Sequence, residues 1–451
     1  MPFLPHSDAD REQMLAAIGV PSMDALFADV PEAQRYPELA VPAALSELEV
    51  RWQLEDLAAA NFTTGDGPCF LGAGAYNHFV PAVIDALLRR GEFLTAYTPY
   101  QPEVSQGTLQ AIFEYQTMIC ALTGMEVSNA SHYDGATATA EAVIAALNVH
   151  RLKRRRVVIS PCVHPEYRAV VRTYTQGMGL QVVGDEPIGD KVGDDRQALL
   201  GQLDDNTACL IVQYPDFLGR FEDLSSLGQA AHDMGALFVV VADPIALGLL
   251  KPPGEFGADI VVGEGQALGG GLSFGGPYLG FYATREEHVR KMAGRLVGQT
   301  VDAEGKRGYV LTLSTREQHI RREKASSNIC TNQGLMVLAA AVYMAGMGRC
   351  GLRRVAELCY HRAHYAADRI RHLHGFALLD DRPFFKEFAV RCPFAVSEIN
   401  ALLMDDYGII GGYDLGRDYP HLQNTMLLCV TEMTPRDEID ALVEVLQEVG
   451  Q

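Results

Sequence analysis

Short apolar runs alternate with longer amphipathic segments through the middle of the chain. The runs are rich in valine and isoleucine and have the length of strands, whereas a segment such as 223–236 shows helical spacing. This alternation is typical of βαβ units, and it predicts a mostly parallel, buried sheet with helices on both faces. The predicted strands are 156–160, 180–185, 208–215, 237–244, 259–264 and 278–284.

The segment 331–451 follows a different pattern. Two strands, 385–392 and 425–430, and a helix at 397–407 indicate a small α+β domain. Thr434 and Pro435 predict the start of a last helix, with the threonine as cap and the proline at the first helical position. We therefore divide the chain into an N-terminal helical arm (1–45), a large α/β domain (46–330) and a small C-terminal α+β domain (331–451).

Composition excludes several classes of protein. The 451 residues include 37 Lys+Arg and 57 Asp+Glu, a formal net charge of −20, which is not typical of a nucleic-acid binder. No apolar run is long enough to predict a membrane span, and the polar, acidic N-terminus lacks the pattern of a signal peptide. The nine cysteines are scattered without metal-binding spacing. We expect buried thiols, no metal and a cytoplasmic location.

Asp243 stands at the carboxyl end of a predicted strand, the place where open α/β sheets bind ligands. In pyridoxal-phosphate enzymes of the aspartate-aminotransferase type, an aspartate at such a position keeps the ring nitrogen protonated, so that the ring can accept electrons. The alternative is a loop carboxylate that caps nearby backbone amides. The sequence leaves both readings open.

Residues 134–137 precede a helical segment, 138–148, and consist of Asp134, Gly135, Ala136 and Thr137. Small residues and a hydroxyl at a helix start leave backbone amides free to bind an anion such as phosphate. The alternative is ordinary capping by the Asp134 side chain.

A pyridoxal enzyme needs a lysine for its Schiff base, and here no lysine stands where it is expected. The segment 263–269, which follows the strand after Asp243, contains none. Of the seven lysines, only Lys251 lies between Asp243 and Lys291, and it precedes that strand. A nicotinamide site is not favoured either, because Leu268 interrupts the glycine pattern, and no P-loop motif is present.

Five stretches of the chain closely resemble one family, the P-protein of the glycine cleavage system, and within it the first subunit of members split into two chains. The longest are Ala96 to Gly107, which includes Tyr-Thr-Pro-Tyr-Gln-Pro-Glu, and Leu313 to Thr331, which includes Thr-Arg-Glu-Gln-His-Ile-Arg-Arg-Glu-Lys-Ala. The others are Phe70 to Pro81, Phe113 to Met118 and Asn129 to Thr137.

The resemblance implies an α/β, pyridoxal-phosphate-dependent transferase-like fold of the aspartate-aminotransferase type. It also implies an oxidoreductase that works as a heterotetramer of two first and two second subunits. The second subunit would bind pyridoxal phosphate through its lysine, and the first would complete the site. Together they would decarboxylate glycine through a pyridoxal aldimine and pass the aminomethyl group to the lipoyl arm of H-protein.

The resemblance carries over to individual residues in three groups. The first group is expected to form a pocket for substrate or the lipoyl arm at the subunit interface, where Glu103 and Gln106 would orient the phenols of the two tyrosines; it consists of Tyr97, Thr98, Tyr100, Gln101, Glu103 and Gln106. The second group is expected to form a vestigial cofactor pocket and consists of His132, Asp134, Gly135, Thr137 and Asp243. The third group is expected at the interface, where it would bind a carboxylate or form structural pairs with Glu317 and Glu323; it consists of Arg316, His319, Arg321 and Arg322.

Two other functions compete with this hypothesis. One is a self-sufficient pyridoxal decarboxylase that uses Lys251 or Lys291. The other is a binding or regulatory protein that keeps the fold without activity. For the two tyrosines, the alternative to a substrate contact is simple packing at the subunit interface.

Overall fold

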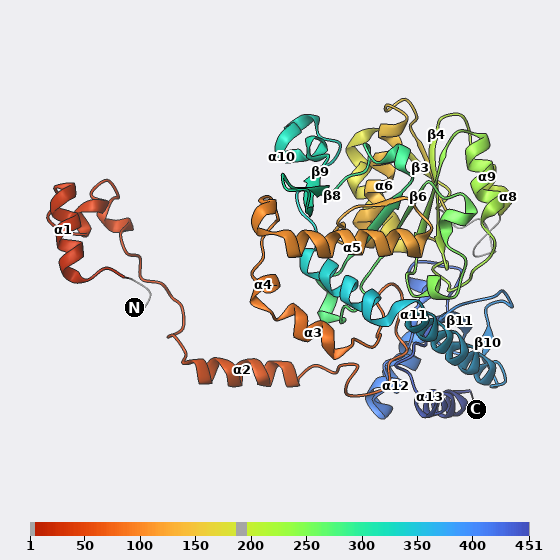
Figure 1. The fold of residues 1–451 in the computed structure, drawn as a ribbon. Helices are drawn as coiled ribbons and strands as arrows, with labels where there is room; N and C mark the ends of the chain where they lie inside the picture. The colour runs from red at the N-terminus through yellow and green to blue at the C-terminus, as the bar shows by residue number, and fades with distance from the viewer. Residues whose placement is uncertain (1–4, 186–195, 451) are drawn as a thin grey trace. The chain divides into compact units, whose positions relative to one another are not determined.

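A computed structural model describes residues 5–185 and 196–450 (Figure 1). The chain divides into two compact units, Met1–Phe62 and Thr63–Gln451. The first unit contains helices α1 (Asp8–Ile18) and α2 (Glu47–Ala59), each opened by a serine capping box. Helix α2 therefore lies in the first unit, which ends at Phe62.

The second unit is built on a seven-stranded sheet in the order β1-β7-β6-β5-β4-β2-β3. Its centre is parallel, as predicted, because β2 through β6 pair in the same direction. At one edge β7 runs antiparallel to β6, and β1 antiparallel to β7. The strands are β1 (Val127–Ser128), β2 (Arg156–Ile159), β3 (Gln181–Val183), β4 (Thr207–Tyr214), β5 (Leu237–Ala242), β6 (Ile260–Glu264) and β7 (Gly280–Thr284).

Helices cover both faces of this sheet, so successive residues of the central strands enter different cores. Val239 of β5 packs with helices α6 (Gly135–Val149) and α7 (Pro165–Thr175). Val240 packs on the other face with α5 (Gln106–Thr123), α9 (Ser225–Asp233) and the first half of α11 (Gly334–Ile370). Two short helices, α3 (Ala82–Leu88) and α8 (Arg196–Leu200), add Ile84 and Leu199 to the second of these cores, and the short helix α4 (Gly91–Leu94) follows α3.

Helix α11 has 37 residues and runs from one core of the large sheet into the core of the C-terminal part. Its length and apolar content would allow a membrane span, but its two halves instead pack into protein. Val337 and Tyr343 lie in the sheet core, and Ala363 and Ile370 in the C-terminal core. The helix bends at Gly348, whose φ of 58° and ψ of −175° suit a glycine.

The C-terminal part contains the predicted α+β layer. An antiparallel sheet in the order β10-β11-β13-β12 packs against α12 and α13. The last helix begins at Arg436, so Pro435 is its N-cap and Thr434 makes no capping bond; the predicted start is one residue early. The elements are β10 (Ala377–Leu378), β11 (Glu387–Arg391), α12 (Val396–Tyr407), β12 (Tyr413–Asp414), β13 (Thr425–Cys429) and α13 (Arg436–Val449).

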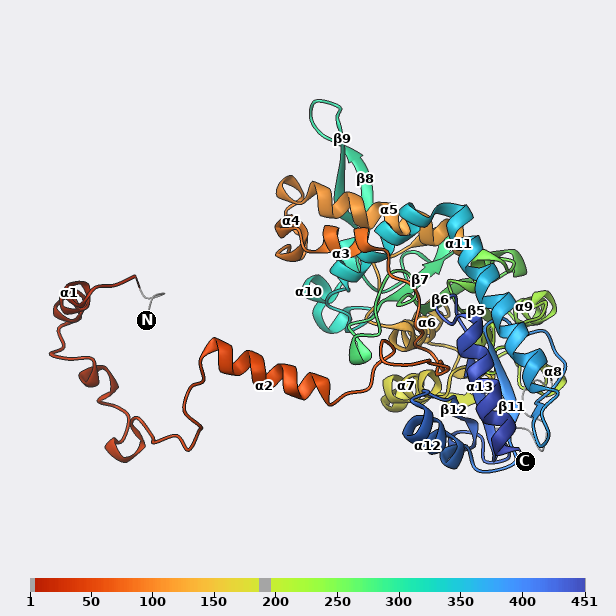
Figure 2. The same cartoon turned by 90° about the horizontal axis from the view of Figure 1, so that it is seen from below.

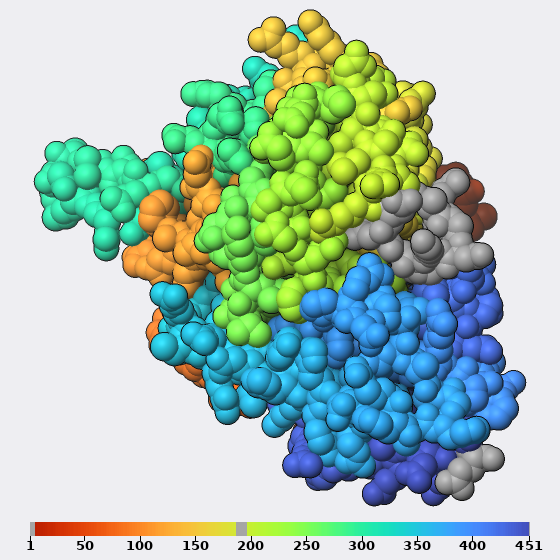
Figure 3. Space-filling view, turned by 90° about the vertical axis from the view of Figure 1, so that its right-hand side faces the viewer, coloured from red at the N-terminus to blue at the C-terminus, as the bar shows by residue number. Residues whose placement is uncertain are grey.

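A two-stranded hairpin stands out from the second unit (Figures 2 and 3). It is formed by β8 (Leu296–Val301) and β9 (Arg307–Thr312), and it leads into the short helix α10 (Gln318–Arg321). The apolar pattern of the sequence does not predict this hairpin. Its outer end is exposed, with Val301 64% exposed, whereas Leu296 and Val297 at its base are buried.

Candidate functional site

Asp243 follows β5 at the carboxyl edge of the sheet, and its side chain caps backbone amides of its own loop, as the plain alternative predicts. Its Oδ1 atom accepts hydrogen bonds from the amides of Ile245 (2.9 Å) and Ala246 (3.4 Å). Its Oδ2 atom lies 2.8 Å from Nζ of Lys386. The carboxylate therefore caps its own loop, and it also faces a cation supplied by the chain itself.

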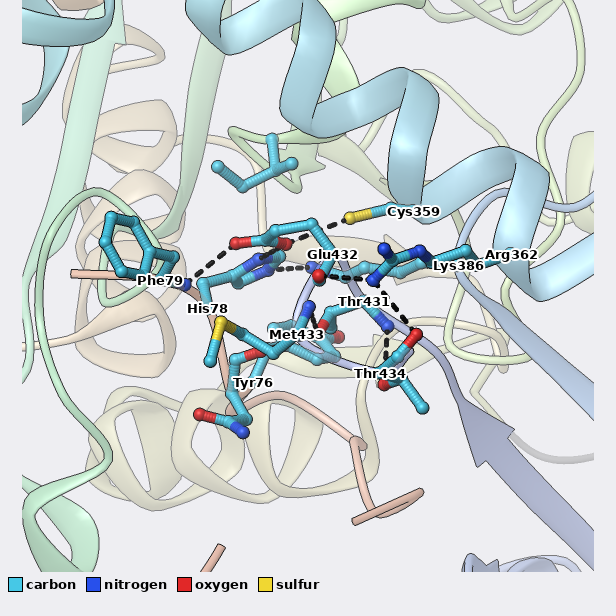
Figure 4. Close-up of polar contacts among 12 residues, drawn as sticks. Tyr76, His78, Phe79, Cys359, Arg362, Lys386, Thr431, Glu432, Met433 and Thr434 are labelled. Atoms are coloured by element: carbon cyan, nitrogen blue, oxygen red, sulfur yellow. Dashed lines mark hydrogen bonds and ion pairs between the residues drawn. The ribbon is translucent and has the colours of Figure 1, made fainter. Parts of the chain in front are cut away.

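Lys386 lies immediately before β11 and is only 1% exposed. Its Nζ is 3.1 Å from Nε2 of His78, whose Nδ1 is 2.7 Å from Oε2 of Glu432 (Figure 4). The same Nζ lies 3.5 Å from the ring centroid of Tyr76, a favourable cation–π distance. A continuous polar chain thus runs from Asp243 through Lys386 and His78 to Glu432.

The protonation states in this chain follow from its contacts. Burial lowers the pKa of Lys386, but the neighbouring acidic groups, with Asp243 the foremost, together hold that pKa above its usual value. Burial and the lysine charge lower the pKa of His78, so the ring is neutral. Burial opposes ionisation of Glu432, yet the hydrogen bond from His78 lowers its pKa to about 2. The lysine therefore donates to Nε2, and Nδ1–H donates to the Glu432 carboxylate.

Two carboxyl groups occupy the start of helix α6, and both belong to the chain itself. Asp134 caps the helix by accepting from the amide of Thr137 at 2.7 Å, as the plain alternative predicts. Glu264, at the end of β6, accepts from the amide of Gly135 at 3.0 Å. A Cβ atom on Gly135 would lie 2.3 Å from the Tyr167 hydroxyl, so a side chain already fills the space above the helix start.

His132 does not join this group. It is fully buried, its ring stands edge-on to Tyr282, and its Nε2 lies 3.1 Å from the amide nitrogen of Asn129. Burial lowers the pKa of His132 to about 3, so the ring is neutral. Of the predicted vestigial pocket, Asp243 lines a cavity, whereas Asp134 and Thr137 cap the helix beside it.

A pyridoxal phosphate molecule does not fit the residues at this edge of the sheet. The cavity lined by Asp243, Glu264 and Tyr167 measures about 40 Å³, whereas small-molecule pockets usually measure about 300–1,000 Å³. Lys386 occupies the position facing Asp243, and Glu264 occupies the helix start. Lys251 and Lys291 are both exposed and do not line the cavity.

The segment 97–106 forms a second candidate site. Tyr97 is 85% exposed, and Gln101 and Glu103 are also exposed. Tyr97 and Thr98 line a pocket of about 200 Å³ against α5 and the start of α11. Its lining is mixed, with apolar side chains beside the polar groups of Thr98, Thr108, Thr331 and Asn332.

Arg295, which the sequence analysis does not identify, organises this second site. Its side chain is almost fully buried, and it donates to the hydroxyl of Tyr100 at 3.1 Å. It also donates to the carbonyl of Cys330 at 2.6 Å and to the side chains of Thr331 and Asn332. One guanidinium therefore joins the tyrosine segment to the segment before α11. No motif marks this arginine in the sequence.

Gln106 does not orient the phenols, contrary to the prediction. Its amide accepts from the backbone amide of Tyr309 at 2.9 Å and donates to the Tyr309 carbonyl at 2.9 Å. It therefore attaches the tyrosine segment to β9, because a primary amide can satisfy both backbone groups of an edge strand. Glu103 contributes only an exposed side chain, and Tyr100 contacts His319 instead, with ring centroids 5.7 Å apart.

The arginine-rich segment has mixed roles. Arg316 donates to the backbone carbonyls of Leu313, Met292 and Gly294. Its contacts are therefore structural, but they are made to the backbone and not to the expected partners Glu317 and Glu323. His319 lies 3.6 Å from Glu317 and next to Tyr100. Arg321, the last residue of α10, and Arg322, which follows it, are both exposed.

Glu141 in α6 supports the segment before α11 and gives a pH-dependent prediction. It is 2% exposed, its Oε1 accepts from Ser327 at 2.7 Å, and burial raises its pKa to about 7. Because the pKa of Glu141 is higher in the folded chain than in the unfolded chain, the protonated side chain stabilises the fold. This stabilisation is complete below the unfolded-state pKa of about 4.5 and is lost as the pH rises to about 7. We expect Glu141→Gln to reduce that loss by about 3 kcal/mol, measured by urea unfolding between pH 5 and 8. An unchanged pH profile would contradict this prediction.

Comparisons with known proteins agree with this fold. The model of the family "Glycine cleavage system P-protein" matches residues 1–446. Two curated relatives are each named "Probable glycine dehydrogenase (decarboxylating) subunit 1". The protein of Thermomicrobium roseum is 57% identical over 448 residues, covering 99% of both chains. The protein of Desulforamulus reducens is 52% identical over 444 residues, covering 98% of both chains.

Two solved structures resemble the chain. An inhibitor-bound glycine decarboxylase (P-protein) of the glycine cleavage system superposes with a TM-score of 0.91 at 45% identity, over 100% of both chains. A sphingosine-1-phosphate lyase of Burkholderia pseudomallei superposes with a TM-score of 0.67 at 16% identity, covering 93% of this chain and 94% of the other, and shows the fold alone. The family match and the full-length relatives lead to one conclusion. This chain belongs to the glycine cleavage system P-protein family.

Proposed function

We propose that this chain is the first subunit of a two-subunit glycine decarboxylase, an oxidoreductase of the glycine cleavage system. It pairs with a second, lysine-bearing subunit, and two such pairs form a heterotetramer. The names of the full-length relatives, each called subunit 1, support a split enzyme. The single observation that carries the division of labour is the filled sheet edge, where Lys386 and Glu264 stand in place of a cofactor.

The second subunit, in this proposal, binds pyridoxal phosphate covalently through its lysine. The cofactor supplies an electron sink for the loss of carbon dioxide from glycine. The present chain contributes surface residues to that site and to the entrance for the lipoyl arm of H-protein, which receives the aminomethyl group. The scattered cysteines, without the spacing of a disulfide framework, support a reducing, cytoplasmic location.

The tyrosine segment is the part of this chain best suited to that role. The Tyr97 side chain extends into solvent, and Tyr100 is held through its hydroxyl by Arg295. A phenol can donate to a carboxylate or to a carbonyl of the lipoyl arm. Leu94 and Val104 on either side are also exposed, as expected where another protein surface covers the segment.

Tyr97→Phe and Tyr100→Phe are expected to lower turnover of the reconstituted complex by about tenfold each, the worth of one hydrogen bond to a charged group. Each change removes only a hydroxyl, so the thermal midpoint of the isolated chain should stay within about 2 °C of wild type. Steady-state glycine–bicarbonate exchange measures the effect. Wild-type exchange in both variants would refute the assignment and leave interface packing as the role of these rings.

One experiment separates this proposal from its alternatives. Pyridoxal phosphate is added to this chain alone, to the second subunit alone and to their mixture, and absorption and glycine–bicarbonate exchange are followed. We expect no Schiff-base band with this chain alone, and exchange in the mixture above that of the second subunit. A borohydride-reducible band with this chain alone would support the self-sufficient decarboxylase. No gain on mixing would support a protein without a catalytic role.

A further inference from the structure

A buried carboxylate stands beside the tyrosine segment without the hydrogen bonds that such a group normally makes. Glu317 precedes helix α10, is only 8% exposed, and makes no side-chain capping bond to that helix. Among the described residues, none hydrogen-bonds its Oε1 atom, and the Nε atom of the nearby Arg295 also has no hydrogen-bond partner. Buried polar groups in folded proteins are almost always paired, so an incompletely paired carboxylate at this place calls for an explanation.

The groups around this carboxylate connect it to Tyr100. Its Oε2 atom lies 3.6 Å from Nδ1 of His319 and 4.0 Å from Nε of Arg295. The His319 ring meets the Tyr100 ring edge-on, with centroids 5.7 Å apart, and Arg295 donates to the Tyr100 hydroxyl at 3.1 Å. Glu317 is therefore linked to the tyrosine segment through both His319 and Arg295.

A purely structural role does not account for this arrangement. A buried carboxylate stabilises a fold only when hydrogen bonds satisfy its oxygens, and Oε1 of Glu317 receives none from the described residues. Arg316, the neighbour in sequence, donates to three backbone carbonyls and not to this carboxylate. The carboxylate thus keeps capacity to stabilise a positive charge on the group that it faces, the His319 ring.

The orientation of the His319 ring suits proton transfer. Because Nδ1 faces the Glu317 carboxylate, the neutral ring carries its hydrogen on Nδ1 and presents Nε2 as an acceptor. No other described residue hydrogen-bonds Nε2. When Nε2 takes up a proton, the carboxylate stabilises the charged ring, as in the carboxylate–histidine pairs of hydrolases. The 3.6 Å separation is longer than a hydrogen bond, and contacts of this kind commonly shorten only when substrate is bound.

We propose that His319 is the proton-transfer group of the aminomethyl transfer and that Glu317 is its positioning residue. This inference rests on the proposed function, because it takes the lipoyl disulfide as the oxidant. The electron pair that remains on the glycine carbon after loss of carbon dioxide forms a bond to one lipoyl sulfur, and the sulfur–sulfur bond breaks. The carbon is oxidised and the disulfide is reduced. The released sulfur takes the Nε2 proton of His319, and in the reverse direction it returns that proton.

The first measurement needs only the isolated full chain, labelled with nitrogen-15 in its histidine rings. The resonances of His319 are those that are missing from the spectrum of His319→Gln. At about pH 8.5, where histidine rings are ordinarily neutral, we expect the Nδ1–H tautomer in the wild-type chain. Glu317→Gln should shift the ring toward the Nε2–H tautomer, because the carboxylate that holds the hydrogen at Nδ1 is lost. An Nε2–H ring in wild type, or a tautomer that does not respond to Glu317→Gln, would overturn the proposal.

The second measurement follows aminomethyl transfer to lipoylated H-protein by the reconstituted complex, read from the intact mass of H-protein. His319→Gln should lower kcat by about 100-fold, the usual worth of a general acid, with the KM for H-protein within about twofold of wild type. Glu317→Gln should lower kcat by at least about tenfold, because it removes only the group that orients the ring. His421→Gln, at an exposed histidine of the C-terminal part, is the matched control and should leave kcat unchanged.

Added imidazole separates proton transfer from a structural effect. In His319→Ala, free imidazole can enter the space of the missing ring, and we expect it to raise kcat by at least about tenfold. Imidazole should leave the wild-type rate unchanged. Wild-type kcat in His319→Gln, a loss in His319→Ala that imidazole does not reverse, or a loss that follows the thermal midpoint would each overturn the proposal.

The two proposals fail in distinguishable ways. If mixing the wild-type subunits gives no gain in exchange, the proposed function fails, and the role of His319 in aminomethyl transfer fails with it. If the wild-type mixture is active but His319→Gln transfers the aminomethyl group at the wild-type rate, only the role of His319 fails.

Discussion

Lys386→Met is expected to destabilise the sheet-bearing unit by about 3–5 kcal/mol, the usual effect of leaving a buried charge without its partner. Methionine matches the length of the lysine stem, so the loss reflects the missing charge and not a cavity. Asp243 would keep its loop amides but lose its cation, and His78 would lose the donor at Nε2. Denaturant unfolding at pH 7 measures the change.

The partner substitution tests whether charge is the cause. Asp243→Asn in the Lys386→Met background removes the second charge, and we expect the double variant to recover at least about 1 kcal/mol. Lys386→Arg is the matched control for charge with altered geometry. Additive losses in the double variant would show that the two side chains stabilise the fold independently. Unchanged stability in Lys386→Met would refute the pairing altogether.

Arg295→Ala is expected to reduce exchange by the reconstituted complex about 100-fold, because displacement of a site by about 1 Å has effects of this size. The arginine holds Tyr100 and the 330–332 segment through four hydrogen bonds. Its role is positioning, since its own side chain is almost fully buried while the tyrosine segment that it holds is exposed. Arg295→Lys keeps the charge but loses the planar guanidinium, so its exchange activity should lie between that of wild type and that of Arg295→Ala.

A test through Tyr100 distinguishes positioning from general stability. If Arg295 acts through that phenol, Tyr100→Phe should add little further loss of kcat in the Arg295→Lys background, although it lowers exchange in the wild-type background. Thermal midpoints of all variants are measured in parallel. A full additional loss in the double variant, or a loss of exchange that follows the thermal midpoint alone, would contradict the positioning role.

The layers of this fold could be predicted from the sequence, and the contacts between distant segments could not. The six predicted strands of the large sheet all form, because buried β-branched runs report burial directly. Asp243 was placed correctly because it ends such a run. Lys386, which faces it, stands in another layer, and no local pattern links the two.

In the candidate site, too, local motifs could be predicted from the sequence and contacts between distant segments could not. Tyr97 and Tyr100 stood out through an unusual motif, but the groups that hold the segment, Arg295 and Gln106, make long-range contacts. Gln106 was assigned to the phenols because it is near them in sequence, whereas its partner is β9. The hairpin β8–β9 was missed since only its base is buried, so most of it lacks the apolar alternation of a strand.

Lys386, which faces Asp243, acts like a bound ligand that is covalently part of the protein it stabilises. A free ligand stabilises a protein by an amount that rises with its concentration, and stability then varies with supply. A tethered group has a fixed effective concentration, so its contribution is constant. The Lys386–Asp243 contact therefore stabilises this edge of the sheet by the same amount whatever the supply of any small molecule.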